Sequence, residues 1–271
     1  MKNLLAQCLG LTIASSSGVM VERRAKILGK NEIPNHLYTV KWGEAKFVSV
    51  DVSTLKGIAK AQDLDLVGSG VAEAVITPLL PKATAHLFST KRRARIFSVM
   101  RHPVERAASL FYYLQKATWE RSFDPTLQSM TLEEYATSDK AESNWMVWML
   151  NNEPVEAMDE RHLKIAKQIL REKVLIGLTK NMEESVQRFY SYFGWSRDDY
   201  GWSPCERDSL FGGTNSNKHP KVKEGTKAWE LLASRNALDI ALYEYAVELF
   251  HDQSSLFPKP VIEQPNVRGR R

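Results

Sequence analysis

The chain has 271 residues, 43% of them hydrophobic and 25% charged, and this balance is typical of a globular domain that can bury a sizeable core. The net charge of +5 suits an anionic ligand, but no basic stretch interleaved with aromatic residues indicates specific nucleic-acid binding. No run of 18 apolar residues predicts a membrane-spanning helix.

The first 18 residues, MKNLLAQCLGLTIASSSG, allow two interpretations. A lysine, an apolar stretch and small residues together outline a secretory signal peptide. The alternative is a helix that carries its leucines and Cys8 on one side and ends near Gly10. Cys8 and Cys205 have no metal-binding or redox spacing, and the sequence leaves open whether they form a disulfide.

Two segments of the first half predict strands. Residues 46–54, KFVSVDVST, predict one, and Ser53 or Thr54 stands where a cap of the following helix is expected. Residues 94–101, ARIFSVMR, form a nearly unbroken apolar run, which is typical of a strand buried on both faces of a parallel sheet. Pro103 fits the first turn of the helix that follows.

The second half predicts several helices around one further strand. The helices are expected at residues 141–152, 159–173, 181–195 and 226–250. VLIGL, at 174–178, predicts another buried strand, and Thr131 with Glu134 forms the pattern of a capping box. Loops are predicted at 122–130 and 203–225, and a disordered basic tail at 253–271. Strands that alternate with helices favour an α/β fold with a parallel sheet.

Arg101 and Ser109 flank the junction between the predicted strand 94–101 and its helix. Ligands of open α/β sheets bind at the carboxyl ends of strands, and a helix N-terminus favours anions. A guanidinium offers a forked donor to phosphate oxygens. In the alternative interpretation Arg101 pairs with a carboxylate and Ser109 is a small packing residue, and the spacing by itself favours this second interpretation.

In context, RHPVERAASLFYY (residues 101–113) resembles the 3′-phosphate-binding motif of sulfotransferases, which use 3′-phosphoadenosine 5′-phosphosulfate (PAPS) as sulfuryl donor. Arg101 and Ser109 match the arginine and serine that bind the 3′-phosphate in that family. The segments around residues 174–195 and 215–222 resemble later parts of the family, as does the pattern Asn236-x-x-Asp239-x-x-x-Tyr243. The resemblance covers most of the chain and is nearest to Golgi-type carbohydrate sulfotransferases, especially algal, diatom-like members.

The resemblance implies a P-loop-like three-layer sandwich with a parallel central sheet, formed by residues 1–252. It implies transfer of a sulfuryl group from PAPS to a hydroxyl or amine of an acceptor, with a carbohydrate expected, without a metal. Lys218 and His219 are candidates to reach the cofactor phosphates, and the alternative is that they are solvated loop residues. Asp51 and His86 are weak candidates for the catalytic base, and Asp51 could equally cap the helix that follows it. The implied location is the Golgi lumen or its membrane, although the sequence predicts no anchor.

Two further expectations concern bulky side chains. Trp145 and Trp148 could line a groove for sugars, but core packing is the favoured role. Arg106 is expected to point to solvent or to pair near Glu105.

One element of the family is not found in the sequence. The family's 5′-phosphosulfate loop joins a strand to a helix and combines a basic residue with glycines and a threonine or serine. Since the family places this loop directly before its first helix, residues 1–11 are expected to be that helix, and the preceding strand and loop to be missing from this chain. The alternative function is therefore a module without sulfotransferase activity that binds PAPS, its product 3′-phosphoadenosine 5′-phosphate (PAP) or another partner. A phosphotransferase is disfavoured, because Gly-x-x-x-x-Gly-Lys-Ser/Thr is not found.

Overall fold

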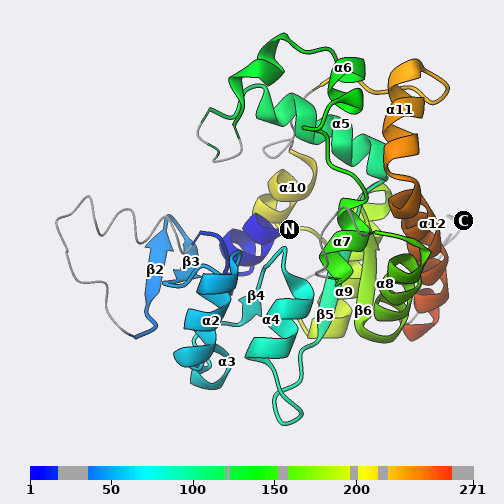
Figure 1. The fold of residues 1–271 in the computed structure, drawn as a ribbon. Helices are drawn as coiled ribbons and strands as arrows, with labels where there is room; N and C mark the ends of the chain where they lie inside the picture. Colours follow the sequence, from blue (N-terminus) through cyan, green and yellow to red (C-terminus); the bar gives the residue numbers. More distant parts are fainter. Residues whose placement is uncertain are drawn as a thin grey trace, which may run out of the picture.

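The computed structural model describes residues 1–17, 36–118, 120, 123–151, 158–195, 201–212 and 219–257. It shows a mixed α/β fold that contains parallel strand pairs, and this confirms the predicted fold class at that level (Figure 1). Within these residues, no helix has both the length and the apolar character needed to span a bilayer.

The amino-terminal segment forms the short helix η1 (Leu4–Cys8), in which Leu4, Leu5 and Cys8 are buried. Gly10 follows with a φ of +69°, a conformation that glycine adopts without strain. The helical interpretation of this segment therefore holds in the structure. A disulfide joins Cys8 to Cys205, whose Cα lies 5.5 Å away.

Cys205 belongs to α10 (Pro204–Phe211), which lies where the sequence predicted a loop. That prediction was wrong, although the helix has clear start signals. Ser203 and Glu206 form a capping box, and Pro204 occupies the first turn. The loop was predicted because the segment as a whole is rich in glycine, asparagine and proline, although most of these residues come after the helix.

Four strands form the first sheet, in the order β2-β3-β1-β4: β2 (Thr39–Trp42), β3 (Ala45–Val48), β1 (Thr12–Ala14) and β4 (Ala74–Val75). β2 and β3 form an antiparallel hairpin, whereas β3 and β4 both run parallel to the central β1. The strand predicted at 46–54 ends at Val48, because Asp51 builds a turn and Thr54 caps the next helix. The helices beside this sheet are α2 (Leu55–Asp63), α3 (Leu66–Ser69) and α4 (Leu80–Leu87).

Two strands form the second sheet, β5 (Ile96–Met100) and β6 (Val174–Leu178), which pair in parallel with Met100 opposite Leu178. Both were predicted. All five residues of β6 are buried, but those of β5 up to Val99 are only half-buried. Burial of β5 on both faces was thus predicted wrongly, because the edge of β5 that faces away from β6 borders a cavity.

Helices α8 (Glu160–Lys173), α9 (Met182–Phe193) and α12 (Ala237–Asp252) surround the second sheet. Gly194 ends α9 with a φ of +71°, as predicted. A separate group consists of α5 (Pro103–Leu114), α6 (Leu132–Thr137) and α11 (Lys227–Arg235), which lie together at the top of Figure 1 and share one hydrophobic core. The predicted capping box of Thr131 and Glu134 starts α6, and the predicted loop before it contains the 3-10 helix Pro125–Ser129.

The long helix predicted at 226–250 is two helices, because the chain bends at the buried Asn236 between α11 and α12. The bend is held by reciprocal caps with α7 (Trp145–Asn151). Asn144 Oδ1 accepts from the N–H groups of Leu238 and Asp239 at the start of α12. Asp239 accepts from the N–H groups of Met146 and Val147 at the start of α7.

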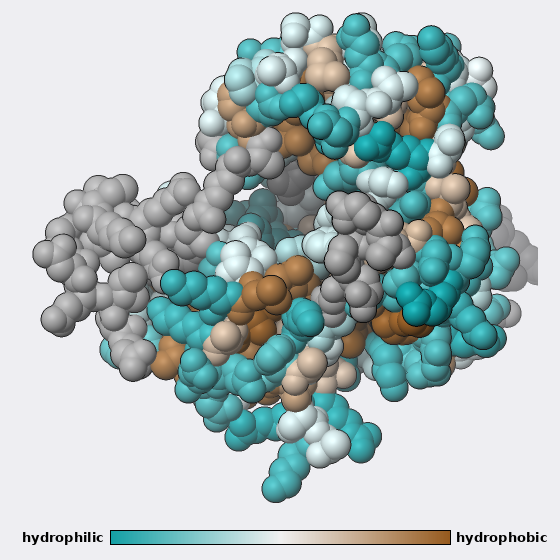
Figure 2. All heavy atoms as spheres, in the orientation of Figure 1, coloured by the Kyte–Doolittle hydropathy of each residue, from teal (hydrophilic) through white to brown (hydrophobic). Residues whose placement is uncertain are grey.

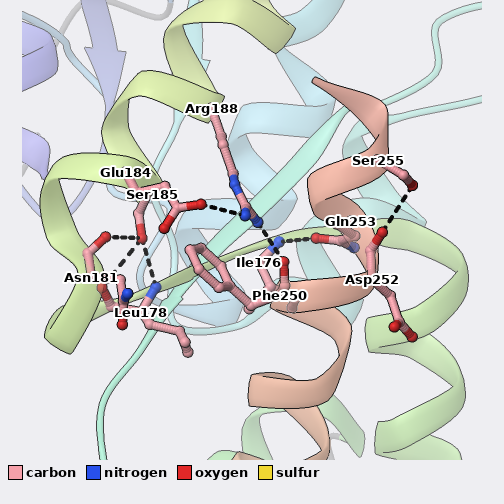
Figure 3. Close-up of polar contacts among 10 residues, drawn as sticks. All are labelled: Ile176, Leu178, Asn181, Glu184, Ser185, Arg188, Phe250, Asp252, Gln253 and Ser255. Carbon is pink, nitrogen blue, oxygen red and sulfur yellow. Dashed lines mark hydrogen bonds and ion pairs between the residues drawn. The ribbon is translucent and has the colours of Figure 1, made fainter. Parts of the chain in front are cut away.

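Side chains close the outer edge of β6 (Figure 3). The Gln253 amide accepts from Ile176 N–H at 2.9 Å and donates to Val174 C=O at 2.8 Å. The Ser185 hydroxyl accepts from Leu178 N–H at 2.9 Å. Gln253, which the sequence assigned to the disordered tail, therefore belongs to the packed fold, whereas residues 258–271 of that tail lie outside the described residues.

Candidate functional site

Two basic residues follow neighbouring strands at the same edge of the second sheet. Arg101 comes directly after β5, and Lys180 lies in the short 3-10 helix Thr179–Asn181 that follows β6. Because β5 and β6 are parallel and in register, their carboxyl ends meet at this edge, where α/β folds bind ligands. Sequence reasoning missed Lys180, although its place just after a buried strand is the same signal that singled out Arg101.

The side chain of Arg101 lies along the face of α5 that also carries Ser109. Glu105, Ser109 and Tyr112 are spaced four and three residues apart, so they share one helix face. Arg101 Nε is 3.7 Å from Glu105 Oε2, and both side chains are more than a third exposed. The guanidinium therefore lies beside Glu105, on the helix face that also carries Ser109.

Glu105 competes with any anion for Arg101. An ion pair this exposed is worth about 0–1 kcal/mol, because water screens both charges. A charge-assisted hydrogen bond from a guanidinium to a phosphate contributes about 1.5–3 kcal/mol. A phosphate that meets both Arg101 and the N-terminus of α5 can therefore displace Glu105.

The carboxyl-terminal half of α5 meets the chain segment that begins at residue 219. The His219 ring stacks on the Tyr112 ring, with centroids 5.0 Å apart and planes at 15°. His219 Nδ1 also lies 2.9 Å from the carbonyl oxygen of Pro220. The structure thus brings His219 to the helix that carries Ser109, while Lys218 lies outside the described residues.

A cavity of about 500 Å³ opens beside this contact. Its lining combines aromatic residues of α5 with the first turn of α6 and two lysines, namely Phe111, Tyr112, Thr131, Glu133, Lys221 and Lys223. The cavity therefore has apolar walls for a flat ring and positive charge at its rim.

His102, next to Arg101, is a titratable group that sequence reasoning missed. Its ring stacks on Trp229 at 5.0 Å, and its buried Nδ1 has no hydrogen-bond partner among the described residues. Burial lowers the pKa of His102 below its ordinary value, although Glu105 opposes the effect. The imidazole is consequently neutral at pH 7 and retains an unused ring nitrogen at the carboxyl edge of β5.

The two candidates for the catalytic base make local hydrogen bonds, and none of their hydrogen bonds among the described residues reaches Arg101. Asp51 Oδ1 accepts from the N–H and hydroxyl of Ser53, at 2.9 and 2.6 Å, in the turn between β3 and α2. His86 Nδ1 lies 2.9 Å from Gln62 Oε1 near the end of α4. In Figure 1 the chain runs from that end of α4 through the loop at the bottom of the view, whereas α5 leads away from the opposite end of β5. Both residues therefore make structural contacts here.

Arg106 was expected in solvent or near Glu105, and this expectation was wrong. Its side chain is only 18% exposed, and its Nη1 donates to Glu142 at 2.7 Å. The guanidinium lies 4.6 Å from the ring centroid of Trp145, which itself packs against the core around β6. Core packing is thus the role that the structure gives Trp145.

The chain matches no protein-family model, and a search of curated proteins gave no match.

Proposed function

We propose that this chain is a sulfotransferase-like domain that binds PAPS and its product, 3′-phosphoadenosine 5′-phosphate (PAP), through Arg101 and Ser109. The observation that carries the proposal is the position of Arg101, at the carboxyl end of a parallel strand with its guanidinium on the Ser109 face of α5. The 3′-phosphate would accept from the guanidinium, from the Ser109 hydroxyl and from the free N–H groups of the first turn of α5. Lys180 adds positive charge from the adjacent strand end.

The proposed reaction moves the sulfuryl group from the phosphate of PAPS to a hydroxyl or amine, with a carbohydrate as acceptor. The bond between sulfur and the bridging oxygen breaks, a bond from the acceptor oxygen or nitrogen to sulfur forms, and the acceptor loses a proton. PAP leaves with the electron pair of the broken bond. Lys218 and His219 are proposed to bind the donor phosphates, and the stacking of His219 on Tyr112 supports the approach of that loop to α5.

The finer architecture is part of the same proposal. We propose a P-loop-like three-layer sandwich, supported by the parallel pairs of β1 with β3 and β4 and of β5 with β6. The disulfide between Cys8 and Cys205 supports an oxidising compartment, such as the Golgi lumen that the family resemblance implies.

Titration calorimetry with PAP tests the anion site. Arg101→Ala should weaken PAP binding about 10- to 150-fold, and Ser109→Ala about 2- to 12-fold, the scales of a charged and a neutral hydrogen bond. Arg92→Ala is the matched control, because Arg92 is exposed and pairs with Asp65 on the surface at 3.2 Å. The proposal fails if adenosine 5′-phosphate binds as tightly as PAP, or if Arg101→Ala binds PAP like the wild type.

The second candidate is a module that binds PAPS or PAP without transferring the sulfuryl group. It is favoured by the local hydrogen bonds of Asp51 with Ser53 and of His86 with Gln62, which give both candidate bases a structural role. Incubation with sulfur-35-labelled PAPS and a panel of glycans separates the two candidates. Labelled glycan supports the enzyme, whereas PAP binding that depends on Arg101 without any label transfer supports the binding module.

A further inference from the structure

The space between β4 and β5 separates the two sheets. Among the described residues, no hydrogen bond joins the backbones of these two strands. A cavity of about 430 Å³ lies there, lined on one side by residues 72–77 and on the other by residues 93–99, with Met1 and Trp195 also in its wall. Figure 2 shows hydrophobic residues at the surface in the region of β4 and the start of α4. We call this space the slot.

Among the residues that the structure describes, the slot-facing backbone groups of β5 have no hydrogen-bond partner. Ile176 N–H bonds to Gln253 on the outer side of β6, so the neighbouring Leu175 and Gly177 turn their N–H and C=O groups toward β5. In a parallel pair, each residue that faces the partner strand forms its two hydrogen bonds with the residues on either side of its register partner. The register partner itself therefore directs its N–H and C=O groups away from the pair. With Phe97 opposite Leu175 and Val99 opposite Gly177, Phe97 and Val99 direct their N–H and C=O groups away from β6 and into the slot.

Within the described ranges of the chain, the slot-facing edge of β4 likewise has no partner strand. Ile76 N–H bonds to Ala14 C=O, and Ala74 is the register partner of Ile13. Ile76 and Ala74 therefore turn their backbone groups toward β1, and Val75 between them turns its own toward the slot. Two strand edges thus present donors and acceptors to the same cavity.

The outer edge of β6 differs from the two edges at the slot, because side chains close it. Gln253 and Ser185 satisfy the outer edge of β6, as Figure 3 shows. Val75, Phe97 and Val99 are half-buried, and a strand edge without a partner is a template for pairing with a further strand. Apolar side chains form one part of the slot wall, since Met1, Ala74, Ile76, Phe97 and Trp195 belong to one hydrophobic cluster, and the charged Glu73, Arg93 and Arg95 also line the cavity. An occupant must therefore offer backbone-like donors and acceptors along both edges and apolar side chains on both faces.

We propose that the slot accepts one extended, apolar polypeptide strand of about five residues, which hydrogen-bonds to Val75 on one side and to Phe97 and Val99 on the other. The occupant is a separate peptide segment added as a strand, and it would join the two sheets into one. A small apolar molecule would fill the volume and leave the backbone groups of both edges unpaired. The inference does not depend on the proposed function.

Fluorescence anisotropy tests the proposal with the full chain and a labelled peptide of five alternating valines and isoleucines, flanked by lysines for solubility. The matched control is the same peptide with alternate backbone nitrogens methylated, which removes its donors and retains its side chains. We expect the unmodified peptide to bind at least 10-fold more tightly than the control. Equal binding of both peptides, or of neither, would overturn the proposal.

A pair of proline variants locates the bound peptide. Val99→Pro removes one slot-facing N–H and spares the hydrogen bonds to β6, so it should weaken peptide binding with the circular dichroism spectrum retained. Ser98→Pro removes a hydrogen bond to β6 instead, and it should destabilise the fold. Amide hydrogen exchange on the wild type gives a readout that needs no variant: the peptide should slow the exchange of Phe97, Val99 and Val75. Unchanged exchange at these amides with bound peptide, or a concentration-dependent dimer that excludes the peptide, contradicts the proposed occupant.

Discussion

Asp239 gives the sharpest test of how burial and hydrogen bonding compete in this fold. Its carboxyl is fully buried and accepts from two backbone N–H groups of α7, at 2.8 and 2.9 Å. Burial raises the pKa of Asp239 from its ordinary 3.8 to about 6, while the two N–H groups oppose that rise. The folded state therefore holds a proton on this group at pH values where the unfolded chain has lost it.

The sign of the effect follows from this difference. The pKa of Asp239 is higher in the folded state than in the unfolded state, so proton binding by Asp239 stabilises the fold. This contribution to the unfolding free energy is fully present below about pH 4 and is lost as the pH rises through about 6. A rise from 3.8 to about 6 is equivalent to about 3 kcal/mol of unfolding free energy. The perturbation that isolates it is Asp239→Asn, which is neutral at every pH and nearly the same shape as the protonated acid.

Urea unfolding at pH 4, 5, 6 and 7 measures the effect as the difference between wild type and Asp239→Asn, so that other titrating groups cancel. At pH 4 we expect the wild type to be more stable by about 1–3 kcal/mol, since the asparagine N–H₂ faces one of the two backbone N–H groups. This advantage should shrink by about 3 kcal/mol by pH 7. Asp63→Asn, on the exposed end of α2, is the control.

Two outcomes would refute this reasoning. An advantage that stays constant from pH 4 to pH 7 would show that burial and the two N–H groups balance. An advantage that grows toward pH 7 would show that the two N–H groups dominate and hold the pKa below its ordinary value. In either case the reciprocal cap would stabilise the charged carboxylate, and burial of Asp239 would not set its titration.

Two further predictions concern the links that close the fold. Gln253→Ala should lower the unfolding free energy by about 2–5 kcal/mol, because it leaves Ile176 N–H and Val174 C=O of β6 unpaired. Urea unfolding measures this loss. A loss below about 0.5 kcal/mol, as expected for a substitution at an exposed position, would contradict the role of Gln253 at the edge of β6. The Cys8→Ser, Cys205→Ser double variant should lose about 2–5 kcal/mol, because the disulfide closes a separation of 197 residues and ties η1 to α10. Thermal unfolding with and without a reductant checks this, and a reductant that lowers the midpoint of the double variant as much as that of the wild type would count against it.

The strand at 174–178 and the helix after Pro103 could be predicted from sequence, because each depends on local information. A short, unbroken apolar run is stable only when both of its faces are covered, and VLIGL is indeed buried throughout. Pro103, the capping box at Thr131 and the stop at Gly194 act through the backbone within one helical turn. These features also gave the mixed α/β class and the position of Arg101.

The bend at Asn236 and the surroundings of β5 could not be predicted. Residues 226–250 have a continuous helical pattern, and the bend depends on Asn144, which lies 92 residues earlier in the chain. β5 has the same apolar composition as β6, but its burial is decided by what stands beside its second edge. A strand's neighbours are set by long-range pairing, about which the strand's own residues carry no information.

The sequence by itself determined where elements such as α5, α6 and β6 begin and that Arg101 stands at the end of a strand, because caps, prolines and apolar runs act locally. Only the tertiary structure decided that Lys180 lies at the strand edge of Arg101 and that His219 stacks on α5. It also decided that Arg106 packs against Trp145 and that the edges of β4 and β5 face the slot. These features are contacts between segments far apart in the chain. Their free energies depend on burial and on pairing partners, which exist only after the chain has folded.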